Sequence, residues 1–322
     1  MNDTAHLCPL CASALRGPVI ADGADRLLSL GGSFEVWECA RCELGVTTPQ
    51  PGAEELSRHY PRQYGPYRPA GGLSGRVIAR LRRTRADAVL RSGPFPALLE
   101  GRPSGRVLDV GGGRGDMAGA FARRGWTAHV IEPSPGAVAA ARALGVEAVA
   151  GTLAEAPERF AGCDVVIFNH SLEHLPDPRA DLADACSRLR QGGQVVVAVP
   201  NWSCWQRRRA GASWFHLDLP RHLFHFSPHA LEALARRVGL EPVETRRATS
   251  LVGLPGSIQY RAFGRCIARG PRLRAGLAVA CLLYPLTLVA GRVTGGDTIY
   301  FVARRAARGP APPMRTRTLA GS

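Results

Sequence analysis

Residues 107–116 read VLDVGGGRGD, an apolar strand pattern that runs directly into a glycine-rich turn and then into a helical segment. The turn holds three glycines at alternate positions, Gly111, Gly113 and Gly115. Glycine lets a backbone approach a ligand closely, and the start of the next helix offers free N–H groups. A dinucleotide-binding turn needs a third small residue where Asp116 stands, and a pyrophosphate would be repelled by Asp109 and Asp116. The turn therefore predicts a site for a cationic ligand without phosphate.

Outward from this turn, apolar runs alternate with Ala-rich helical segments, which is typical of a parallel α/β sheet. The pattern predicts strands at 106–110, 127–132, 148–150, 165–169, 194–200, 242–247 and 298–303. It predicts helices at 116–124, 134–144, 180–189 and 228–238. We therefore expect an α/β fold with a seven-stranded sheet and helices on both faces.

Glu132 closes the second predicted strand, where a carboxylate can accept hydrogen bonds from both hydroxyls of a ribose. Four ordered stretches, VLDVGGGRG, VIEPS, DVVIFNHSLEHLPDP and VVVAVPN, together resemble the class I S-adenosylmethionine-dependent methyltransferases. The resemblance implies a Rossmann-like fold and S-adenosylmethionine as cofactor. It implies that Asp109 and the glycines line the methionine end and that Glu132 holds the ribose. It also implies that four residues surround the adenine or the cofactor edge: Thr152, Leu153, Asn169 and His170.

Two Cys-x-x-Cys pairs stand near the N-terminus, Cys8 with Cys11 and Cys39 with Cys42. Such pairs can close a tetrahedral thiolate site of the structural zinc type, with every position filled by protein. A redox pair is disfavoured because neither motif adjoins a strand-to-helix turn. The alternative is four unrelated thiols. We expect a small zinc-ribbon-like module within residues 1–50.

The composition divides the rest of the chain into further zones. Residues 51–104 read as a linker and a helical substrate cap, residues 105–308 as the methyltransferase domain, and residues 309–322 as a disordered tail. A zinc module ahead of a methyltransferase is similar to a bacterial subgroup that includes sugar and natural-product methyltransferases. That resemblance implies a small-molecule or glycan acceptor.

Histidine suits removal of a hydroxyl proton near neutral pH, and two segments supply candidates. His174 follows the fourth predicted strand, either beside the acceptor or merely capping the next helix. Residues 201–229 read as an acceptor lid that includes Trp214, and within them His222 is the first choice for base or acceptor ligand. His225 is the reserve. A second metal site among these histidines and aromatic packing of the lid are the alternatives.

Tyr60, Tyr64 and Tyr67 recur three or four residues apart, as one helix face requires. They either roof the acceptor pocket or staple the linker to the core. We take Tyr60 and Tyr64, with Trp214, as candidate acceptor-binding residues.

The net charge of +15 comes from 41 basic residues that are all Arg, a uniform choice that weakens charge as a sign of a binding partner. Residues 251–296 mix Arg with apolar runs, which suits an anionic membrane surface, a lipid-linked acceptor, a homodimer contact or a buried cap. The uncharged run 275–291 is shorter than the roughly 20 residues of a membrane span. Nucleic acid ranks below a small-molecule acceptor. Without a secretory signal we expect a cytoplasmic protein, with the inner face of the membrane as a second location.

These observations predict a methyltransferase that methylates a hydroxyl of a sugar, glycan or secondary metabolite with a histidine base. Sugar C-methylation and a non-catalytic cofactor-binding scaffold are the alternatives.

Overall fold

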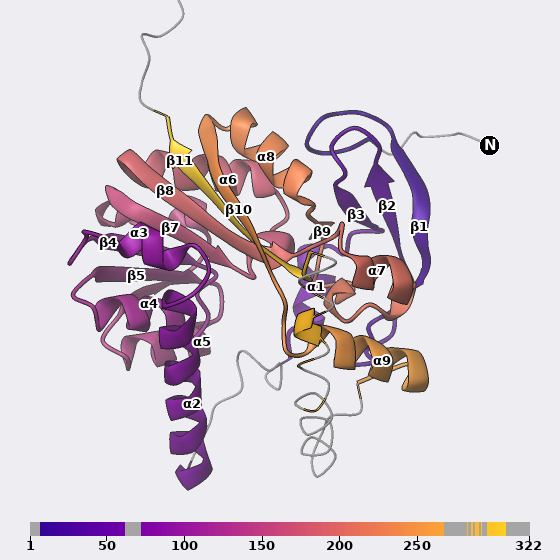
Figure 1. Ribbon diagram of the computed structural model, residues 1–322, viewed down its shortest axis with the longest axis horizontal. Helices are drawn as coiled ribbons and strands as arrows, with labels where there is room; N and C mark the ends of the chain where they lie inside the picture. The colour runs from indigo at the N-terminus through magenta and orange to yellow at the C-terminus, as the bar shows by residue number, and fades with distance from the viewer. Residues whose placement is uncertain are drawn as a thin grey trace, which may run out of the picture.

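The computed structural model describes residues 7–61, 72–266, 282, 285, 287–289, 291 and 295–306. Two β-sheets organise this part of the chain, and they lie on opposite sides of the view in Figure 1.

The larger sheet has seven strands, as the sequence predicted. In spatial order they are β10 (Leu240–Ala248), β11 (Thr298–Arg305), β8 (Leu189–Pro200), β7 (Cys163–Asn169), β4 (Arg106–Val110), β5 (Thr127–Glu132) and β6 (Glu147–Ala150). Strand β11 is antiparallel to both of its neighbours, β10 and β8, and the other neighbouring strands of this sheet are parallel to each other. The direction of chain progression reverses between β4 and β7. Open α/β sheets bind ligands at the carboxyl ends of the strands that flank such a reversal.

Both faces of this sheet are buried, which explains its nearly continuous apolar strands. The helices are α1 (Ala53–Arg58), α2 (Gly72–Leu90), α3 (Phe95–Leu99), α4 (Asp116–Ala122), α5 (Pro135–Arg142), α6 (Pro178–Arg188), α7 (Trp205–Ala210), α8 (Pro228–Arg237) and α9 (Gly253–Phe263). Helices α6 and α8 share one core cluster with Val195 of β8. Helices α4 and α5 share another with Val196. Successive strand residues thus enter opposite cores, so the predicted helices on both faces are confirmed.

Three helices that pack on the larger sheet begin with a polar N-cap residue followed by proline. Ser134, Asp177 and Ser227 each accept a hydrogen bond from the first turn of α5, α6 and α8. Proline is favourable at the first helical position because its missing N–H would have no helical partner there. The cap explains why α6 begins at Pro178, two residues before the predicted start.

The smaller sheet is antiparallel and contains β1 (Leu15–Gly23), β2 (Phe34–Cys39), β3 (Gly45–Thr48) and β9 (Phe224–His225). Its last strand comes from residues 201–229, which the sequence led us to expect as a lid. The N-terminal 50 residues and this later segment therefore build one sheet. Strand β1 carries only three buried residues without strict alternation, so no strand periodicity announced it.

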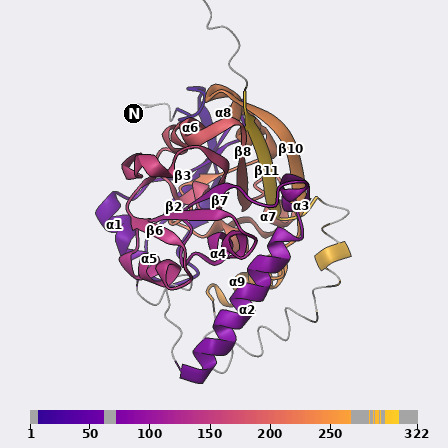
Figure 2. The same ribbon diagram turned by 90° about the vertical axis from the view of Figure 1, so that its left-hand side faces the viewer.

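Helix α2 packs against the larger domain through its C-terminal half, where Ala86 and Leu90 are buried. Its N-terminal half projects away from the rest of the fold (Figure 2), and Val77 and Leu81 are exposed there. No helix among the described residues is long and apolar enough to cross a membrane. Tyr64, Tyr67, the tail 309–322 and most of residues 267–294 lie outside the described residues.

Candidate functional site

A pocket of about 560 Å³ opens at the carboxyl ends of β4 and β7. Its sheet side is formed by Asp109, Gly111, Gly112, Gly113, Asn169 and His170. Its opposite side is formed by His174, Phe215, His216, Asp218, His222 and Tyr260. Helix α2 adds Arg82 and Arg85 to the wall. The glycine turn and the histidine-rich segment, over 100 residues apart in the sequence, therefore share one cavity.

Gly111, Gly113 and Gly115 of the turn have positive φ, but each has different surroundings. A Cβ on Gly111 would lie 2.6 Å from the side chain of Ser171, and a Cβ on Gly115 would lie 2.8 Å from Ala141. Gly113 has open space around it. Gly111 and Gly113 line the pocket, while Gly115 allows close packing against α5 and lies outside the lining.

Asp109 ends the buried strand β4 with its side chain at the pocket. The carboxyl is 1% exposed, and its Oδ1 atom accepts no hydrogen bond from the described residues. Burial, with the nearby negative charges of Glu132 and Asp116, raises the pKa of Asp109 to about 7. An unpaired buried carboxylate is costly unless a positive ligand meets it. These residues therefore fit the cationic methionine end of S-adenosylmethionine.

Glu132 ends β5 beside the glycine turn. Its carboxylate accepts hydrogen bonds from the backbone N–H of Gly113 at 3.0 Å and of Ser134 at 2.9 Å. It is buried and does not itself line the pocket. The Glu132 side chain is thus bonded to the glycine turn through Gly113, which does line the cavity.

The four residues expected around the adenine are not all brought together. Asn169 and His170 follow β7 and line the pocket. Thr152 instead caps a short 3-10 turn with Glu155, and Leu153 is buried in the core. Neither residue is part of the pocket wall.

Glu173, His174 and His222 form a compact cluster at the pocket. Each offers one ligand atom, and these atoms lie within 4.8 Å of one another. Glu173 and His174 belong to the 3-10 turn η4 (Leu172–His174), and the backbone N–H of Leu223 donates to the carbonyl of Glu173. That bond joins the two segments that supply the cluster.

A backbone carbonyl lies beside Nδ1 of each of these histidines. Nδ1 of His174 lies 3.0 Å from the carbonyl of Arg221, and Nδ1 of His222 lies 2.9 Å from the carbonyl of His216. A carbonyl only accepts, so Nδ1 of His222 carries hydrogen and Nε2 of its neutral ring does not, whereas Nδ1 of His174 meets both the Arg221 carbonyl and Tyr60 Oη. Burial, together with the nearby His174, His225 and His216, holds the pKa of His222 well below its usual value.

Two predicted acceptor residues lie elsewhere. His225 is buried in β9, where Nε2 meets Thr47 Oγ1 at 3.1 Å and burial lowers its pKa to about 3. Trp214 packs beside Trp202, with ring centroids 6.1 Å apart. Neither lines the pocket, because both complete the packing of the smaller sheet, and this corrects their expected acceptor-side position. Tyr60 Oη contacts His174 Nδ1 at 2.9 Å, behind the cluster.

The pocket wall contains a second histidine arrangement, which was not predicted from the sequence. Nε2 of His216 lies 3.2 Å from Asp297 Oδ2 and 3.0 Å from Ser250 Oγ. Burial opposes ionisation of Asp297, but the hydrogen bond and charge of His216 outweigh it and lower the pKa of this carboxyl. Asp297 is the only acidic residue after position 261, and that isolation in an Arg-rich region was the available signal.

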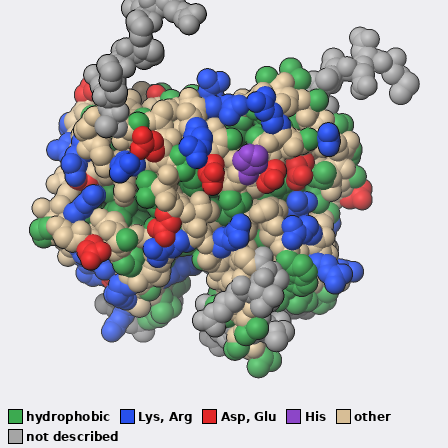
Figure 3. Space-filling model, turned by 45° about the horizontal axis from the view of Figure 1, so that its top comes forward, with side chains coloured by type: hydrophobic (Ala, Val, Ile, Leu, Met, Phe, Trp, Pro, Cys, Tyr) green, Lys and Arg blue, Asp and Glu red, His purple; other side chains and the backbone are tan. Residues whose placement is uncertain are grey.

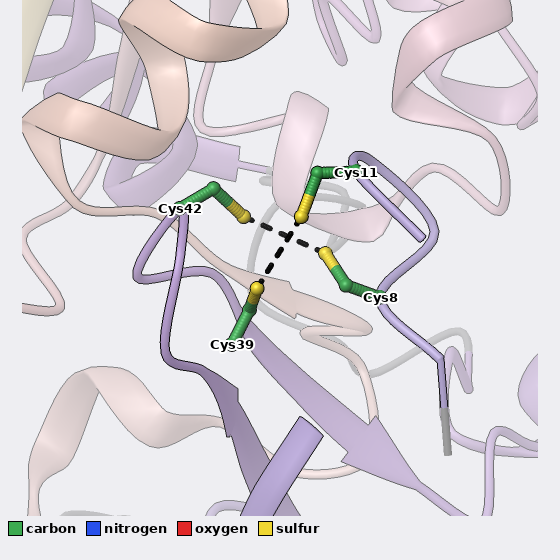
Figure 4. Close-up of side chains that lie close together, drawn as sticks. All are labelled: Cys8, Cys11, Cys39 and Cys42. Carbon is green, nitrogen blue, oxygen red and sulfur yellow. Dashed lines mark hydrogen bonds between the residues drawn. The ribbon is translucent and has the colours of Figure 1, made fainter. Parts of the chain in front are cut away.

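The four N-terminal cysteines converge on one point (Figure 4). Sγ of Cys8 lies 3.5 Å from Sγ of Cys42, and Sγ of Cys11 lies 3.4 Å from Sγ of Cys39. A tetrahedral zinc ion with bonds of about 2.3 Å separates its sulfur ligands by roughly 3.8 Å, so a small expansion admits it.

The backbone around the cysteines repeats the same turn twice. The residues that follow the two pairs, Ala12 and Glu43, both adopt positive φ. In each turn a backbone N–H bonds back to the first cysteine of the pair, from Ala12 to Cys8 and from Glu43 to Cys39. Paired turns of this kind and four sulfur ligands fit a closed, structural zinc site.

A family model described as a methyltransferase domain matches residues 78–245, more than half of the chain. The ubiquinone biosynthesis O-methyltransferase of Xylella fastidiosa (strain 9a5c) is 33% identical over 152 residues, which cover 42% of this chain and 60% of the relative. An uncharacterized methyltransferase of Mycobacterium sp. (strain JLS) is 37% identical over 111 residues, covering 34% of this chain and 44% of the relative. The match thus spans 60% or less of these curated relatives' length.

Similar solved structures include the 1,6-didemethyltoxoflavin-N1-methyltransferase of Burkholderia thailandensis. It is 18% identical, has a TM-score of 0.46, and the match covers 86% of this chain and 98% of that one. A sarcosine dimethylglycine methyltransferase assigned in Galdieria sulphuraria is also 18% identical, with a TM-score of 0.49 and coverage of 69% and 86%.

Proposed function

This chain belongs to the class I S-adenosylmethionine-dependent methyltransferases, and we propose that it methylates a hydroxyl oxygen of a small-molecule or glycan acceptor. The observation that supports this most is the pocket itself. Asp109 and the glycine turn form one side of it, and His174 and His222 form the other. A donor and an acceptor bound on these two sides would meet inside one cavity.

On the donor side, we assign Asp109, Gly111 and Gly113 to the methionine end, and Glu132 to the ribose. We assign Asn169 and His170, which line the pocket, to contacts with the cofactor. Thr152, Leu153 and Gly115 do not line the pocket, and we assign them the role of holding its backbone in place. When bound, the cofactor supplies a methyl group on a positively charged sulfur. Asp109 meets that positive charge from a buried position, where charge interactions are stronger than in water.

On the acceptor side, we propose that the Glu173–His174–His222 cluster activates the hydroxyl. Methyl transfer is an in-line displacement, so positioning accounts for much of the rate and the hydroxyl must lose its proton. His222 presents an unprotonated Nε2 whose orientation is fixed by the carbonyl of His216. Tyr60 supports His174 from behind. We therefore place the acceptor oxygen at His222.

O-methylation is supported by the name of the Xylella relative, a ubiquinone biosynthesis O-methyltransferase. A sugar, glycan or secondary-metabolite acceptor is our proposal from the N-terminal cysteine pairs. Charge does not favour nucleic acid, since Arg side chains alternate with acidic and apolar ones over the face in Figure 3.

We further propose that residues 251–296 touch a membrane surface or a second copy of the chain, in a protein of the cytoplasm. In the described part of this region, α9 exposes Ile258 and Phe263 beside the exposed Arg261. The buried side of α9 carries Tyr260, which lines the pocket. Contact there would lie next to the acceptor and suits a lipid-linked one.

Transfer of radiolabelled methyl groups tests the proposal. Label is followed from S-adenosylmethionine into an extract of the source organism, divided into aqueous, lipid and nucleic-acid fractions. We expect label in small molecules or lipids with the wild type, and at least about a hundredfold less with His222→Ala. Cofactor affinity, measured by calorimetry, should stay unchanged in that variant.

His229→Ala is the matched control, because His229 is exposed and lies outside the pocket. Full transfer by His222→Ala would remove His222 from the reaction. Label only in nucleic acid would contradict the acceptor class. Cofactor binding without label in any fraction would favour the non-catalytic scaffold.

A further inference from the structure

We infer that Glu173, His174 and His222 bind a divalent transition-metal ion, separate from the cysteine site. The side chains come from two segments, η4 and the residues before β9, that meet at the pocket. Three independent features of the cluster support the site: an unsatisfied carboxylate, the orientation of both imidazoles, and the spacing of the ligand atoms.

None of the described residues donates a hydrogen bond to the carboxylate of Glu173. Its side chain is 1% exposed, and neither Oε1 nor Oε2 accepts a hydrogen bond from the described residues. His170 Nδ1 approaches Oε1 at 3.4 Å without hydrogen-bond geometry. A buried carboxylate left in this way costs several kcal/mol unless a cation meets it. The imidazole nitrogen of His222, Nε2, lies farther away, at 3.9 Å from Oε1, and carries no hydrogen to donate.

Both imidazoles are arranged as metal ligands usually are. A ligating histidine commonly donates its other ring N–H to a carbonyl or carboxylate, which fixes the ring and exposes the lone pair. His222 donates from Nδ1 to the carbonyl of His216, and Nδ1 of His174 is held by the carbonyl of Arg221 and by Tyr60 Oη, which leaves its Nε2 free of these partners. The two rings lie at 75° to each other with centroids 4.6 Å apart.

The spacing leaves room for one ion. Bonds of about 2.0–2.2 Å to nitrogen and oxygen place the ligands of a tetrahedral ion roughly 3.3–3.6 Å apart. His222 Nε2 lies 3.9 Å from Glu173 Oε1 and also 3.9 Å from Asp218 Oδ2. A contraction of a few tenths of an ångström brings His222 and Glu173 to the spacing of two ligands on one ion, and all three ligand atoms lie within 4.8 Å of one another. Asp218 lines the pocket, but its carboxylate already accepts hydrogen bonds from Arg221, so we do not count it among the ligands.

The ligand set selects the kind of ion. Two imidazoles with one carboxylate suit zinc, cobalt, iron or manganese, whereas the four thiolates near the N-terminus suit zinc. Three protein ligands leave coordination positions open. Because His174 and His222 line the pocket, an open position faces the cavity. An ion held by His222 Nε2 takes up the lone pair that we proposed as the base, so in the metal-bound chain the ion would instead lower the pKa of an acceptor hydroxyl at the open position. That acceptor step rests on the proposed function; the ion site does not.

Cobalt(II) is the probe, because thiolate ligands give bound cobalt an intense charge-transfer absorption that nitrogen and oxygen ligands do not. The full chain is loaded with Co²⁺, freed of excess metal, and analysed for total and thiolate-bound cobalt. We expect the wild type to hold one cobalt ion per chain that gives no thiolate absorption. This ion is in addition to any cobalt that the cysteines bind. Glu173→Gln and His222→Ala should lose that ion, or bind it at least about tenfold more weakly.

The thiolate absorption itself reports whether each variant is folded around the cysteines, and His229→Ala controls for loss of a surface histidine. The site is overturned if the wild type binds cobalt only through thiolates, or if Glu173→Gln retains the second ion at full affinity. Methyl transfer is measured separately. A chain that holds the ion but transfers no methyl would contradict the proposed function alone, and transfer without the ion would contradict the metal site alone.

Discussion

The guanidinium of Arg221 bonds both carboxylate oxygens of Asp25, at 3.0 Å from Nη1 and 2.9 Å from Nη2, across 196 residues of sequence. Both side chains are fully buried. Asp218 shares the guanidinium through Nε and Nη2, and His59 Nδ1 contacts Asp25 at 3.1 Å. The ion pair therefore joins the residues after β1 to the segment that carries His222.

Asp25→Ala should destabilise the protein by about 3 kcal/mol, because it leaves part of a buried positive charge without its partner. Burial raises the pKa of Asp25, but the hydrogen bonds and charge of Arg221 outweigh burial and lower it below the unfolded value. The stabilisation is therefore present above about pH 4 and is lost as the pH falls through the folded pKa. Urea unfolding of the variant and wild type at several pH values measures it. Asp22→Ala, on the exposed part of β1, is the control, and an equal loss there would contradict the assignment.

Asp109 should make cofactor binding depend on pH. Its folded pKa of about 7 exceeds the unfolded value, so folding retains a proton, and this contribution to stability declines as the pH rises through about 7. A cationic ligand requires the ionised form. We expect S-adenosylmethionine to bind about tenfold more tightly at pH 8 than at pH 6, measured by calorimetry. Asp109→Asn should bind weakly with no such slope, and a retained slope would assign the titration to another group.

The larger sheet was predictable because its strands carry their own signal. In β8 the run Val195–Val199 enters both cores, so the strand is recognisable from local sequence alone. The smaller sheet was not predictable, because β1 buries few residues and β9 is only two residues long. The pairing of β9 with β3 depends on contacts between residues near positions 46 and 224, which are far apart in the sequence.

The site shows the same division. The glycine turn, the Cys pairs and His222 were recognisable because each is a local pattern with a chemical reason. The side chains that pair with the histidines of the site were not recognisable. Glu173 meets His222 across 49 residues, and His216 meets Asp297 across 81. Such pairs are set by packing between segments, which periodicity does not encode, and the same packing moved His225 and Trp214 out of the pocket.

Glu132→Ala should weaken S-adenosylmethionine binding by about 1.5–3 kcal/mol, the usual contribution of hydrogen bonds to a charged group. The variant also frees the backbone N–H of Gly113, so the glycine turn loses one of its restraints. Calorimetry at fixed pH gives the change in affinity. Glu158→Ala, at an exposed position, should bind as the wild type does. Unchanged affinity in Glu132→Ala would reject the ribose assignment.

Removal of the proposed zinc site should change the pocket as well as the cysteine cluster. Replacing Cys39 and Cys42 together with Ser removes half of the sulfur ligands, so metal analysis should find no thiolate-bound ion. Because β3 pairs with β9, which closely follows His222, the double variant should also lower methyl transfer. We expect Tm to fall by at least about 5 °C. Cys186→Ser changes a half-buried thiol outside the cluster and should keep both the ion and the activity. A double variant with an unchanged Tm and full activity would mean that the four cysteines do not support the smaller sheet through a metal ion.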